Sequence, residues 1–353
     1  MRILFLASCC DGLGHLNRMA CIAEEIRNIN PRHKILFLTA PGKDSFLKNE
    51  FEYIELPLSG QTQTENGALP DLDVQACCQV VRDYEPDVVV FDTHFPLALL
   101  RRVKLKGIKT AVILRKAKKE YFKSIVRLKE VDLFIFPHER KELKNYPIPK
   151  KSKAAFVGPV VRKFDESKTR VVVRKYEIKK GDFVVVFTCG SGGHAESSEF
   201  VDAAIKSYRL LRKRIKNLKF IILAGPYFKG KTSFEDILVK NFEPESINLM
   251  RTADLVVAVA SYNTCNEIIS AKAPSLLIPA KRKNEDQIER ARRMEKMGVA
   301  VVLEHANGKN IAGSISKFYA SGKRSRMKEL FSKICMKTGN RKAAKIILGL
   351  KLR

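Results

Sequence analysis

Ten short runs of β-branched and aromatic residues recur along the chain, and they constrain its fold more than any other feature. They are RILFLAS, HKILFLT, DVVVFD, KTAVIL and LFIFP in the first half, then DFVVVFTC, KFIILAG, DLVVAVA, PSLLIP and VAVVLE in the second. Such nearly continuous apolar strands are typical of parallel sheets that are covered on both faces. Helical patterns lie between several of them, as at residues 16–30. The sequence therefore predicts an α/β protein with doubly wound parallel sheets.

Two domains are expected, because 353 residues with 45% hydrophobic content exceed what one core usually serves. A polar, basic segment separates the two groups of strands. We place the first Rossmann-like domain at residues 1–162, a linker at 163–180 and the second Rossmann-like domain at 181–325.

The formal net charge of +28 is the strongest anomaly of the composition. It predicts attraction to phosphates of nucleic acids, lipid surfaces or substrates, while a solvated lysine-rich surface explains it equally well. The chain has no tryptophan, and we find no aromatic residues interleaved with the bases, so nucleic acid is not expected as a partner. No stretch resembles a membrane helix or a signal peptide, which predicts a cytoplasmic protein. The eight cysteines contain no C-x-x-C pair, and no metal site is expected.

Ligands of open α/β sheets bind beyond the carboxyl ends of the strands, so functional residues are expected in the loops there. The first, GLGHLNR, lacks the third glycine of a dinucleotide fingerprint, because Asn17 stands there. It presents His15 at the start of a helix, where a neutral imidazole is suited to accept a proton. The alternative is that His15 only caps the helix.

The loop FDTHFP follows the strand DVVVFD. Its Asp92 or His94 could lie across the sheet from His15. A carboxylate bonded to an imidazole fixes the tautomer and stabilises the imidazolium. An aspartate that caps the next helix is the competing interpretation.

Two glycine-rich turns follow strands of the second domain. Gly190, Ser191, Gly192 and Gly193 could wrap a phosphate with backbone N–H groups. Residues 225–232, GPYFKGKT, match the P-loop pattern, but Pro226 removes an amide donor and the following segment is short for a helix. We therefore interpret residues 225–232 as an ordinary loop.

Polar residues also follow the next two strands. Ser261, Tyr262, Asn263 and Thr264 begin a helix that could hold a diphosphate, and Glu267 could accept the hydroxyls of a ribose. A capping box of Thr264 with Glu267 is the structural alternative. Glu285, Asp286 and Gln287 then lie at the start of a basic helix.

Taken together, GLGHLNR, VGPVVR, CGSGG, YNTCNE and EDQIERA occur in the order seen in GT-B glycosyltransferases. The chain most resembles the MurG-like branch and the predicted bacterial and archaeal glycosyltransferases related to it and to the UDP-glucuronosyltransferases. The resemblance implies the GT-B fold, with two facing Rossmann-like domains and a cleft between them. It also implies that a basic helix at residues 326–353 crosses back to the first domain.

The resemblance further implies that the second domain binds a UDP-sugar. The glycine turn and the helix start at Ser261 would take the diphosphate, and Glu267 the ribose. Gln287 and Asp286 would contact sugar hydroxyls, and the uracil would meet main chain near Phe242. No cofactor or metal would be needed, because amides and helix dipoles would stabilise the departing diphosphate.

In the first domain, His15 would deprotonate the acceptor hydroxyl for an inverting attack, with Asp92 as its orienter. The acceptor side is assigned to Gly12, Gly14, Arg18, His94 and Arg115. The expected reaction moves a hexose or N-acetylhexosamine to a lipid-linked or small acceptor, at the inner face of an anionic membrane. Lys116 stands where the nearer relatives have an acid, so the acceptor is left open.

Three other functions stay open at this point. A sugar-nucleotide hydrolase of the PseG type shares the G-x-G-H-x-x-R loop, with His15 activating water instead of an alcohol. A sugar-nucleotide 2-epimerase shares the architecture. A non-catalytic protein that binds sugar nucleotides or RNA is the third.

Overall fold

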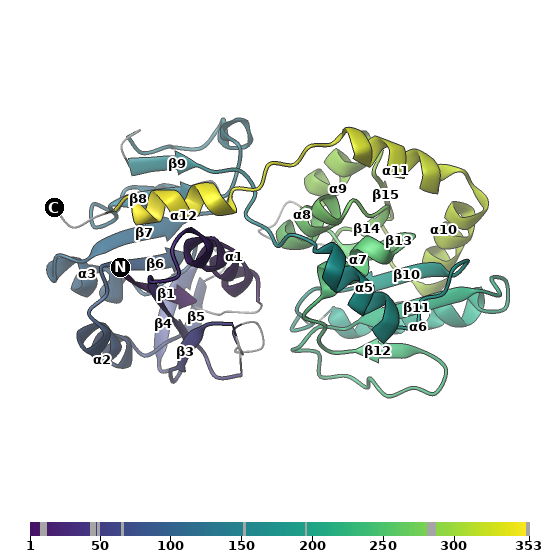
Figure 1. Cartoon of the computed structure of the whole chain (residues 1–353), viewed down its shortest axis with the longest axis horizontal. Coiled ribbons are helices and arrows are strands. Elements are labelled where there is room, and N and C mark those ends of the chain that lie inside the picture. Colours follow the sequence, from purple (N-terminus) through teal and green to yellow (C-terminus); the bar gives the residue numbers. More distant parts are fainter. Residues whose placement is uncertain are drawn as a thin grey trace. The chain divides into compact units, whose positions relative to one another are not determined.

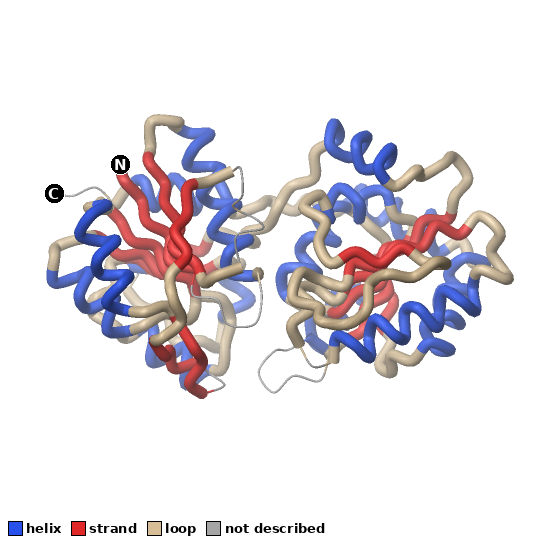
Figure 2. Tube along the Cα trace, turned by 90° about the horizontal axis from the view of Figure 1, so that it is seen from below, coloured by secondary structure: helices blue, strands red, loops and turns tan. Residues whose placement is uncertain are grey.

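A computed structural model describes residues 1–7, 13–42, 47, 50–64, 67–150, 153–194, 196–280 and 287–350. The chain divides into two compact units, one formed by Met1–Val161 with Lys337–Arg353 and the other by Arg162–Met336. Each unit is built around its own parallel sheet, with helices on both sides (Figures 1 and 2).

The sheet of the first unit has the strand order β3-β2-β1-β6-β7-β8-β9, and all of its pairs are parallel. Its strands are β1 (Arg2–Ala7), β2 (Lys34–Thr39), β3 (Glu52–Glu55), β6 (Val88–Asp92), β7 (Lys109–Ile113), β8 (Leu133–Phe136) and β9 (Ala154–Phe156). The helices are α1 (Gly14–Ile29), α2 (Val74–Tyr84), α3 (Leu97–Leu105), α4 (Lys119–Val126) and α12 (Asn340–Leu348), with a 3-10 turn η2 (Arg140–Leu143). An antiparallel pair, β4 (Gly60–Thr64) and β5 (Gly67–Asp71), forms a separate ribbon.

The sheet of the second unit has the order β12-β11-β10-β13-β14-β15, again all parallel. Its strands are β10 (Phe183–Thr188), β11 (Leu218–Leu223), β12 (Leu238–Lys240), β13 (Leu255–Val259), β14 (Ser275–Ile278) and β15 (Ala300–Val302). Its helices are α5 (Glu166–Lys175), α6 (Ser197–Leu211), α7 (Ser246–Thr252), α8 (Tyr262–Ala271), α9 (Gln287–Lys296), α10 (Gly308–Ala320) and α11 (Lys323–Lys333).

The strand β10 explains why these sequences are apolar at nearly every position. Val185 and Phe187 pack in one buried cluster, and Val184 and Val186 pack in another. Because side chains alternate across a strand, the two clusters lie on opposite faces of the sheet. The expectation of doubly wound parallel sheets is confirmed.

The strand order reverses between β1 and β6 in the first sheet, and between β10 and β13 in the second. In each case the two strands pair directly, so the loops beyond their carboxyl ends start side by side. Such switch points are where open α/β sheets bind ligands. His15, in the first turn of α1, and Asp92, at the end of β6, lie at the first switch point, while residues 190–193 and 261–264 follow the two strands of the second.

Residues 163–180, which the sequence indicated as a linker, contain a packed helix. Asp165 caps α5 by accepting the N–H of Ser167 at 2.8 Å, and α5 packs against α7. Val172 is buried, whereas Val171 beside it is 59% exposed. The linker interpretation was wrong because α5 buries only a narrow apolar stripe in an otherwise charged segment.

The single basic helix expected over residues 326–353 is also wrong, because this region holds the end of α11 in the second unit and all of α12 in the first. α12 packs against α1 (Figure 1). Gly339, the residue before α12, donates its N–H to the carbonyl of Pro159 at 2.7 Å. A Cβ at this position would lie 2.6 Å from the carbonyl oxygen of Gly158, so only glycine fits.

Candidate active site

His15 and Asp92 are joined at the switch point of the first sheet. His15 lies in the first turn of α1, and Asp92 is the last residue of β6. Nδ1 of His15 lies 2.7 Å from Oδ1 of Asp92. The side chain of Asp92 is 1% exposed and that of His15 is 14% exposed. Because an ionised carboxylate only accepts, Nδ1 of His15 carries the proton and Nε2 keeps the lone pair.

Arg18 is the second partner of Asp92. Its Nε donates to Oδ2 at 2.9 Å and one terminal nitrogen donates to Oδ1 at 2.7 Å, which is a two-pronged contact. The sequence motif suggested Arg18 for the acceptor side. The structure instead buries it, with a 3% exposed side chain, in the ion pair with Asp92. Its spacing of three residues from His15 on one helix face is the signal that could have shown this.

The charges around this pair fix its protonation. Burial lowers the pKa of His15 below 6.5 against the opposing attraction of Asp92, and the cations Arg18 and Arg115 act in the same direction as burial. Burial alone would raise the pKa of Asp92, but Arg18 and His15 hold it well below its usual range. At neutral pH the site therefore holds a neutral imidazole, an ionised aspartate and a cationic arginine.

The segment after Asp92 has a constrained backbone. Thr93 has φ 47°, in the left-handed region, and its hydroxyl donates to Oδ1 of Asp92 at 2.9 Å. A β-branched residue is rare in this conformation. Tyr121, from α4, donates its hydroxyl to the carbonyl of Thr93 at 2.8 Å. The next residue, His94, lies with its ring centroid 5.8 Å from that of His15.

His138, which follows β8, was not among the site residues predicted from the sequence. Its Nε2 accepts the N–H of Lys116 at 2.9 Å, and its Nδ1 lies 3.6 Å from Glu142. Burial lowers the pKa of His138, so it stays neutral. This bond holds the loop after β7, where Arg115 precedes Lys116. The motif FPHER after β8, which parallels FDTHFP after β6, was the available signal.

The glycine turn of the second unit is packed tightly on one side and open on the other. Gly190 and Gly192 have φ 78° and 76°. A Cβ on Gly192 would lie 2.3 Å from the carbonyl oxygen of Ala224, whereas a Cβ on Gly190 would meet nothing within 4 Å. Tyr227 donates its N–H to the carbonyl of Ser191 at 2.9 Å. The turn therefore exposes backbone at Gly190 while residues 224–228 support it from behind.

Residues 225–232 are not a P-loop. Their segment runs on to β12 without a helix, so it lacks the helix N-terminus on which phosphates rest. Gly225, with φ 98°, instead packs against the turn at Ser191, where a Cβ would lie 2.3 Å from the carbonyl carbon. The interpretation as an ordinary loop holds.

The helix α8 begins at the residues that the sequence indicated, but with a different cap. Ser261 is the N-cap, and its hydroxyl oxygen accepts the N–H of Thr264 at 3.3 Å. The capping box of Thr264 with Glu267 is therefore absent. Tyr262 is 8% exposed beneath Arg290, which donates to the carbonyl of Ala260 at 2.6 Å. Asn263 follows Tyr262 in the first turn.

Glu267 has a partner that sequence reasoning missed. Arg162 donates to its Oε1 from Nε at 3.0 Å and from a terminal nitrogen at 2.9 Å. The same guanidinium donates to the carbonyl of Pro244 at 2.8 Å and to the hydroxyl of Ser246 at 2.7 Å. Arg162 therefore ties Glu267 to the segment that follows Phe242. No local sequence pattern predicts a contact between two residues that are 105 positions apart.

The remaining predicted donor residues lie in the loop after β12 and at the start of α9. Phe242 is half-buried in the loop after β12, next to Glu243, which accepts bonds from Lys175 and Tyr176. Gln287 begins α9, is 1% exposed, and accepts the N–H of Ala280 at 3.0 Å. Gly14 starts α1, while Gly12 and Asp286 lie outside the described residues.

Two features are missing from the described residues. No group of three or more His, Cys, Asp or Glu side chains there could hold a metal ion. None of the helices in those same ranges is long and apolar enough to cross a membrane.

Comparison with known proteins identifies the class. Residues 184–345 match the family model described as Glycosyltransferase family 28 C-terminal domain. Two solved structures share the architecture at low identity. They are a UDP-glucosyltransferase from Polygonum tinctorium (TM-score 0.65, 13% identity, 99% of this chain and 98% of that one) and MurG from Acinetobacter baumannii (TM-score 0.58, 12% identity, 99% of each chain). The fold is GT-B, and the chain is a glycosyltransferase.

A similar protein with an assigned name indicates one kind of glycosyltransferase. The UDP-N-acetylglucosamine--N-acetylmuramyl-(pentapeptide) pyrophosphoryl-undecaprenol N-acetylglucosamine transferase of Acetivibrio thermocellus is 27% identical over 318 residues, which cover 83% of each chain. These similarities support the resemblance to MurG-like glycosyltransferases that the sequence motifs indicated.

Proposed function

We propose that this protein transfers N-acetylglucosamine, or a closely related hexose, from a UDP-sugar to a hydroxyl of a lipid-linked acceptor, with inversion and without a metal. The name of the relative from A. thermocellus supports this donor and this kind of acceptor. The observation that carries the chemistry is the 2.7 Å contact of His15 with Asp92, which leaves Nε2 of a neutral imidazole as a proton acceptor.

The atoms and electrons of the transfer step balance without a further reactant. The acceptor oxygen attacks the anomeric carbon while its proton passes to Nε2 of His15. The bond from that carbon to the diphosphate oxygen breaks, and UDP leaves with the electron pair. Asp92 stabilises the imidazolium that forms, and Arg18 keeps Asp92 ionised.

The second unit supplies groups suited to the donor. We assign the diphosphate to the backbone at Gly190–Ser191–Gly192–Gly193 and to the N-terminus of α8, where amides and the helix dipole favour negative charge. Glu267 takes the ribose, Gln287 with Asp286 the sugar, and the main chain near Phe242 the uracil. The open side of Gly190 supports this assignment.

Peripheral membrane contact is part of the proposal. At the end of α3, Leu105 is 88% exposed and is flanked by Lys104 and Lys106, with Arg101 and Arg102 one turn earlier. An apolar side chain among cations is suited to an anionic lipid surface. Sedimentation with phosphatidylglycerol vesicles should be weakened by Leu105→Gln and by salt. Equal binding to phosphatidylcholine vesicles would contradict this part.

Two assays test the proposal. UDP and UDP-N-acetylglucosamine should raise the melting temperature by several degrees when present far above their Kd, whereas GDP-mannose, or ATP with magnesium, should not. Transfer to a pyrophosphoryl-undecaprenol acceptor should proceed in EDTA and give a β-linked product from the α-linked donor. A melting response only to ATP with magnesium would contradict the donor assignment. Release of free sugar at the same rate with and without acceptor would indicate a hydrolase.

A further inference from the structure

His94 is a buried histidine at the first switch point whose function the pair of His15 and Asp92 does not explain. It follows Thr93 in the loop after β6 and is 6% exposed. Its ring lies 5.1 Å from that of Tyr121 and 5.8 Å from that of His15, measured between centroids. Its Nδ1 lies 3.0 Å from the hydroxyl oxygen of Tyr121.

Counting protons fixes the tautomer of His94. Tyr121 has one hydroxyl proton, and the carbonyl of Thr93, 2.8 Å away, can only accept it. The bond between Tyr121 and His94 therefore needs its proton from Nδ1 of His94. A neutral His94 then keeps the lone pair on Nε2.

The surroundings keep this imidazole neutral. Burial is the largest cause that lowers the pKa of His94, to about 3, and His15, Arg115 and Arg18 lower it further against the attraction of Asp92. Across the physiological range, Nε2 of His94 can thus accept a hydrogen bond but cannot donate one. In the described part of the chain, this nitrogen receives no hydrogen bond. The same nitrogen is not one of the fully enclosed polar atoms without a partner among the described residues, so it faces accessible space where a hydroxyl of a ligand can reach it.

His15 and His94 both use Nδ1, and not Nε2, to bond to the protein. Nδ1 of His15 donates to Asp92, and Nδ1 of His94 donates to Tyr121. Each ring therefore keeps an unprotonated Nε2 on the side away from its protein partner. The two acceptors belong to rings in contact with each other, at one end of one sheet.

We propose that Nε2 of His94 accepts a hydrogen bond from a second hydroxyl of the acceptor molecule, next to the hydroxyl that His15 deprotonates. The acceptor is then a polyol, such as a sugar ring with neighbouring hydroxyls, rather than a simple alcohol. This inference rests on the transferase function proposed above and adds a residue that recognises a second hydroxyl of the acceptor. His94 is a binding residue in this account, and His15 is the base.

Two substitutions of His94 distinguish a role in binding the acceptor from a role in packing the protein. Asn can keep a donor near the place of Nδ1 but has no atom at Nε2, whereas Gln can place its amide oxygen there. With UDP-N-acetylglucosamine as donor, His94→Asn should lower kcat/KM for n-octyl β-D-glucopyranoside by roughly tenfold, the usual scale for one buried hydrogen bond. It should leave the rate with 1-octanol and the pH profile of His15 unchanged, and His94→Gln should restore part of the loss.

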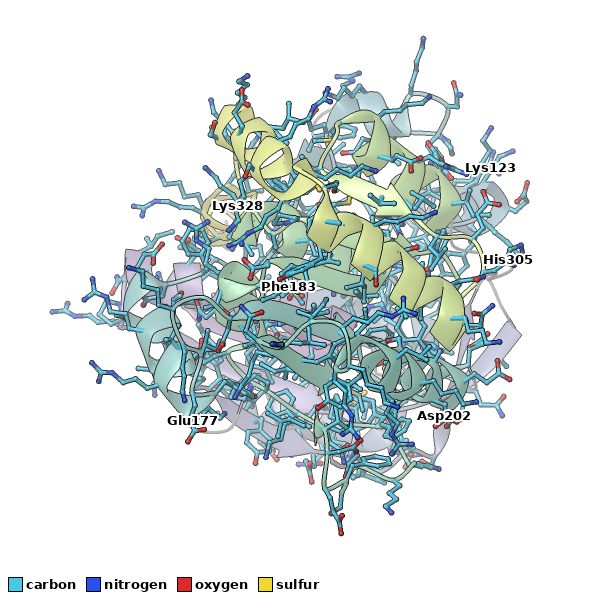
Figure 3. All side chains as sticks on the ribbon, turned by 90° about the vertical axis from the view of Figure 1, so that its right-hand side faces the viewer. Lys123, Glu177, Phe183, Asp202, His305 and Lys328 are labelled. Carbon is cyan, nitrogen blue, oxygen red and sulfur yellow. The ribbon has the colours of Figure 1, made fainter. Side chains whose placement is uncertain are left out.

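His305→Asn is the matched control, because His305 is an exposed histidine of the second unit, labelled in Figure 3. It should leave both rates unchanged. An equal loss with the glucoside and with octanol in His94→Asn would overturn the inference, since it would mean a structural role. Equal losses in His94→Asn and His94→Gln would also overturn it, because only Gln can replace the acceptor atom.

A second experiment, which needs no catalytic turnover, uses NMR of the full chain labelled with ¹⁵N-histidine. His94 should show a protonated Nδ1 and an unprotonated Nε2, and octyl glucoside should shift the Nε2 signal where octanol does not. A protonated Nε2, or a signal that the glucoside leaves in place, would overturn the inference. If UDP-N-acetylglucosamine supports no transfer at all, the proposed function fails, and this experiment still decides the role of His94.

Discussion

His15 and Asp92 are 77 residues apart in the sequence, yet Nδ1 of one lies 2.7 Å from Oδ1 of the other. The pairing of β1 with β6 brings them together, because α1, which follows β1, carries His15, and Asp92 is the last residue of β6. Arg18 closes the arrangement by binding both oxygens of Asp92. Because these three groups form one buried network, a change in any of them should change the other two.

Replacing Arg18 by glutamine should move the pH profile of transfer. The Arg18 cation lowers the pKa of His15, so its removal raises that pKa. His15 acts as a base only when neutral, and the rate falls as the pH drops through its pKa. The acid limb of the profile should therefore shift to higher pH. Arg27→Gln, an exposed arginine on the same helix, is the control, and an unshifted limb in Arg18→Gln would contradict the network.

Asp92→Asn should damage both stability and activity. It leaves the Arg18 cation buried without a counter-charge, which typically costs about 3–5 kcal/mol of unfolding free energy. It should also slow transfer by at least about a hundredfold, since the imidazolium of His15 loses its stabiliser. Urea unfolding and initial rates measure the two effects. Asp202→Asn, at an exposed position of α6 (Figure 3), should alter neither. Full activity of Asp92→Asn would rule out the assigned role.

The sequence was sufficient to predict this pair, because parallel strands place their following loops along one edge. It was insufficient for the ion pair of Arg18 with Asp92, because the motif assigned Arg18 to the acceptor side and gives no sign of a partner 74 residues away. The contact of Arg162 with Glu267 was missed for another reason. It depends on how α5 and α7 pack beside α8, and no periodicity encodes that geometry.

Alanine at two neighbouring glycines should give different outcomes. At Gly192, a Cβ would lie 2.3 Å from the carbonyl oxygen of Ala224, so Gly192→Ala should unfold at clearly lower urea than the wild type. At Gly190, a Cβ would meet no atom within 4 Å, and only the positive φ of 78° costs stability, about 1 kcal/mol. Gly190→Ala should therefore fold but bind UDP more weakly, as seen in the melting shift. Unchanged UDP binding in Gly190→Ala would remove Gly190 from the donor site.

The stability of the first unit should fall in mild acid. An unfolded histidine binds a proton near pH 6.5, whereas folded His94 does so only at about 3. As the pH drops between these values, the unfolded state gains protons that the folded state cannot, so the free energy of unfolding falls. One histidine contributes at most about 1.4 kcal/mol per pH unit. His94→Asn should make the decline shallower in urea unfolding at pH 7 to 4, and an identical decline would contradict a low pKa of His94.

Glu267→Gln tests the donor assignment in the second unit. The amide oxygen can still accept from Arg162, which is less buried than Arg18 and also donates to Pro244 and Ser246, so the fold should persist with reduced stability. The charge that grips the ribose hydroxyls is lost, and KM for UDP-N-acetylglucosamine should rise by roughly tenfold with a smaller change in kcat. Glu199→Gln, an exposed residue of α6, serves as the control. A normal KM in Glu267→Gln would place the ribose elsewhere.

Two segments, residues 163–180 and residues 326–353, differ from what the sequence pattern predicts, and in both the structure depends on tertiary packing. In α5, Val172 is the single buried residue of a charged helix, so the pattern resembles a solvated linker. Near the C-terminus, α11 ends at Lys333, and Gly339, which precedes α12, lies in close approach to the backbone of Gly158, which is a tertiary contact. Strands with continuous apolar runs were easier to predict because they are buried on both faces.

The most direct test of the central claim is the rate of UDP release from UDP-N-acetylglucosamine, with saturating lipid-linked acceptor, in the wild type and in His15→Ala. General-base catalysis by a positioned histidine contributes about 10²–10⁴ in rate, so His15→Ala should fall by that factor while its melting response to UDP is retained. A rate within about twofold of the wild type would contradict the assignment of His15 as the base.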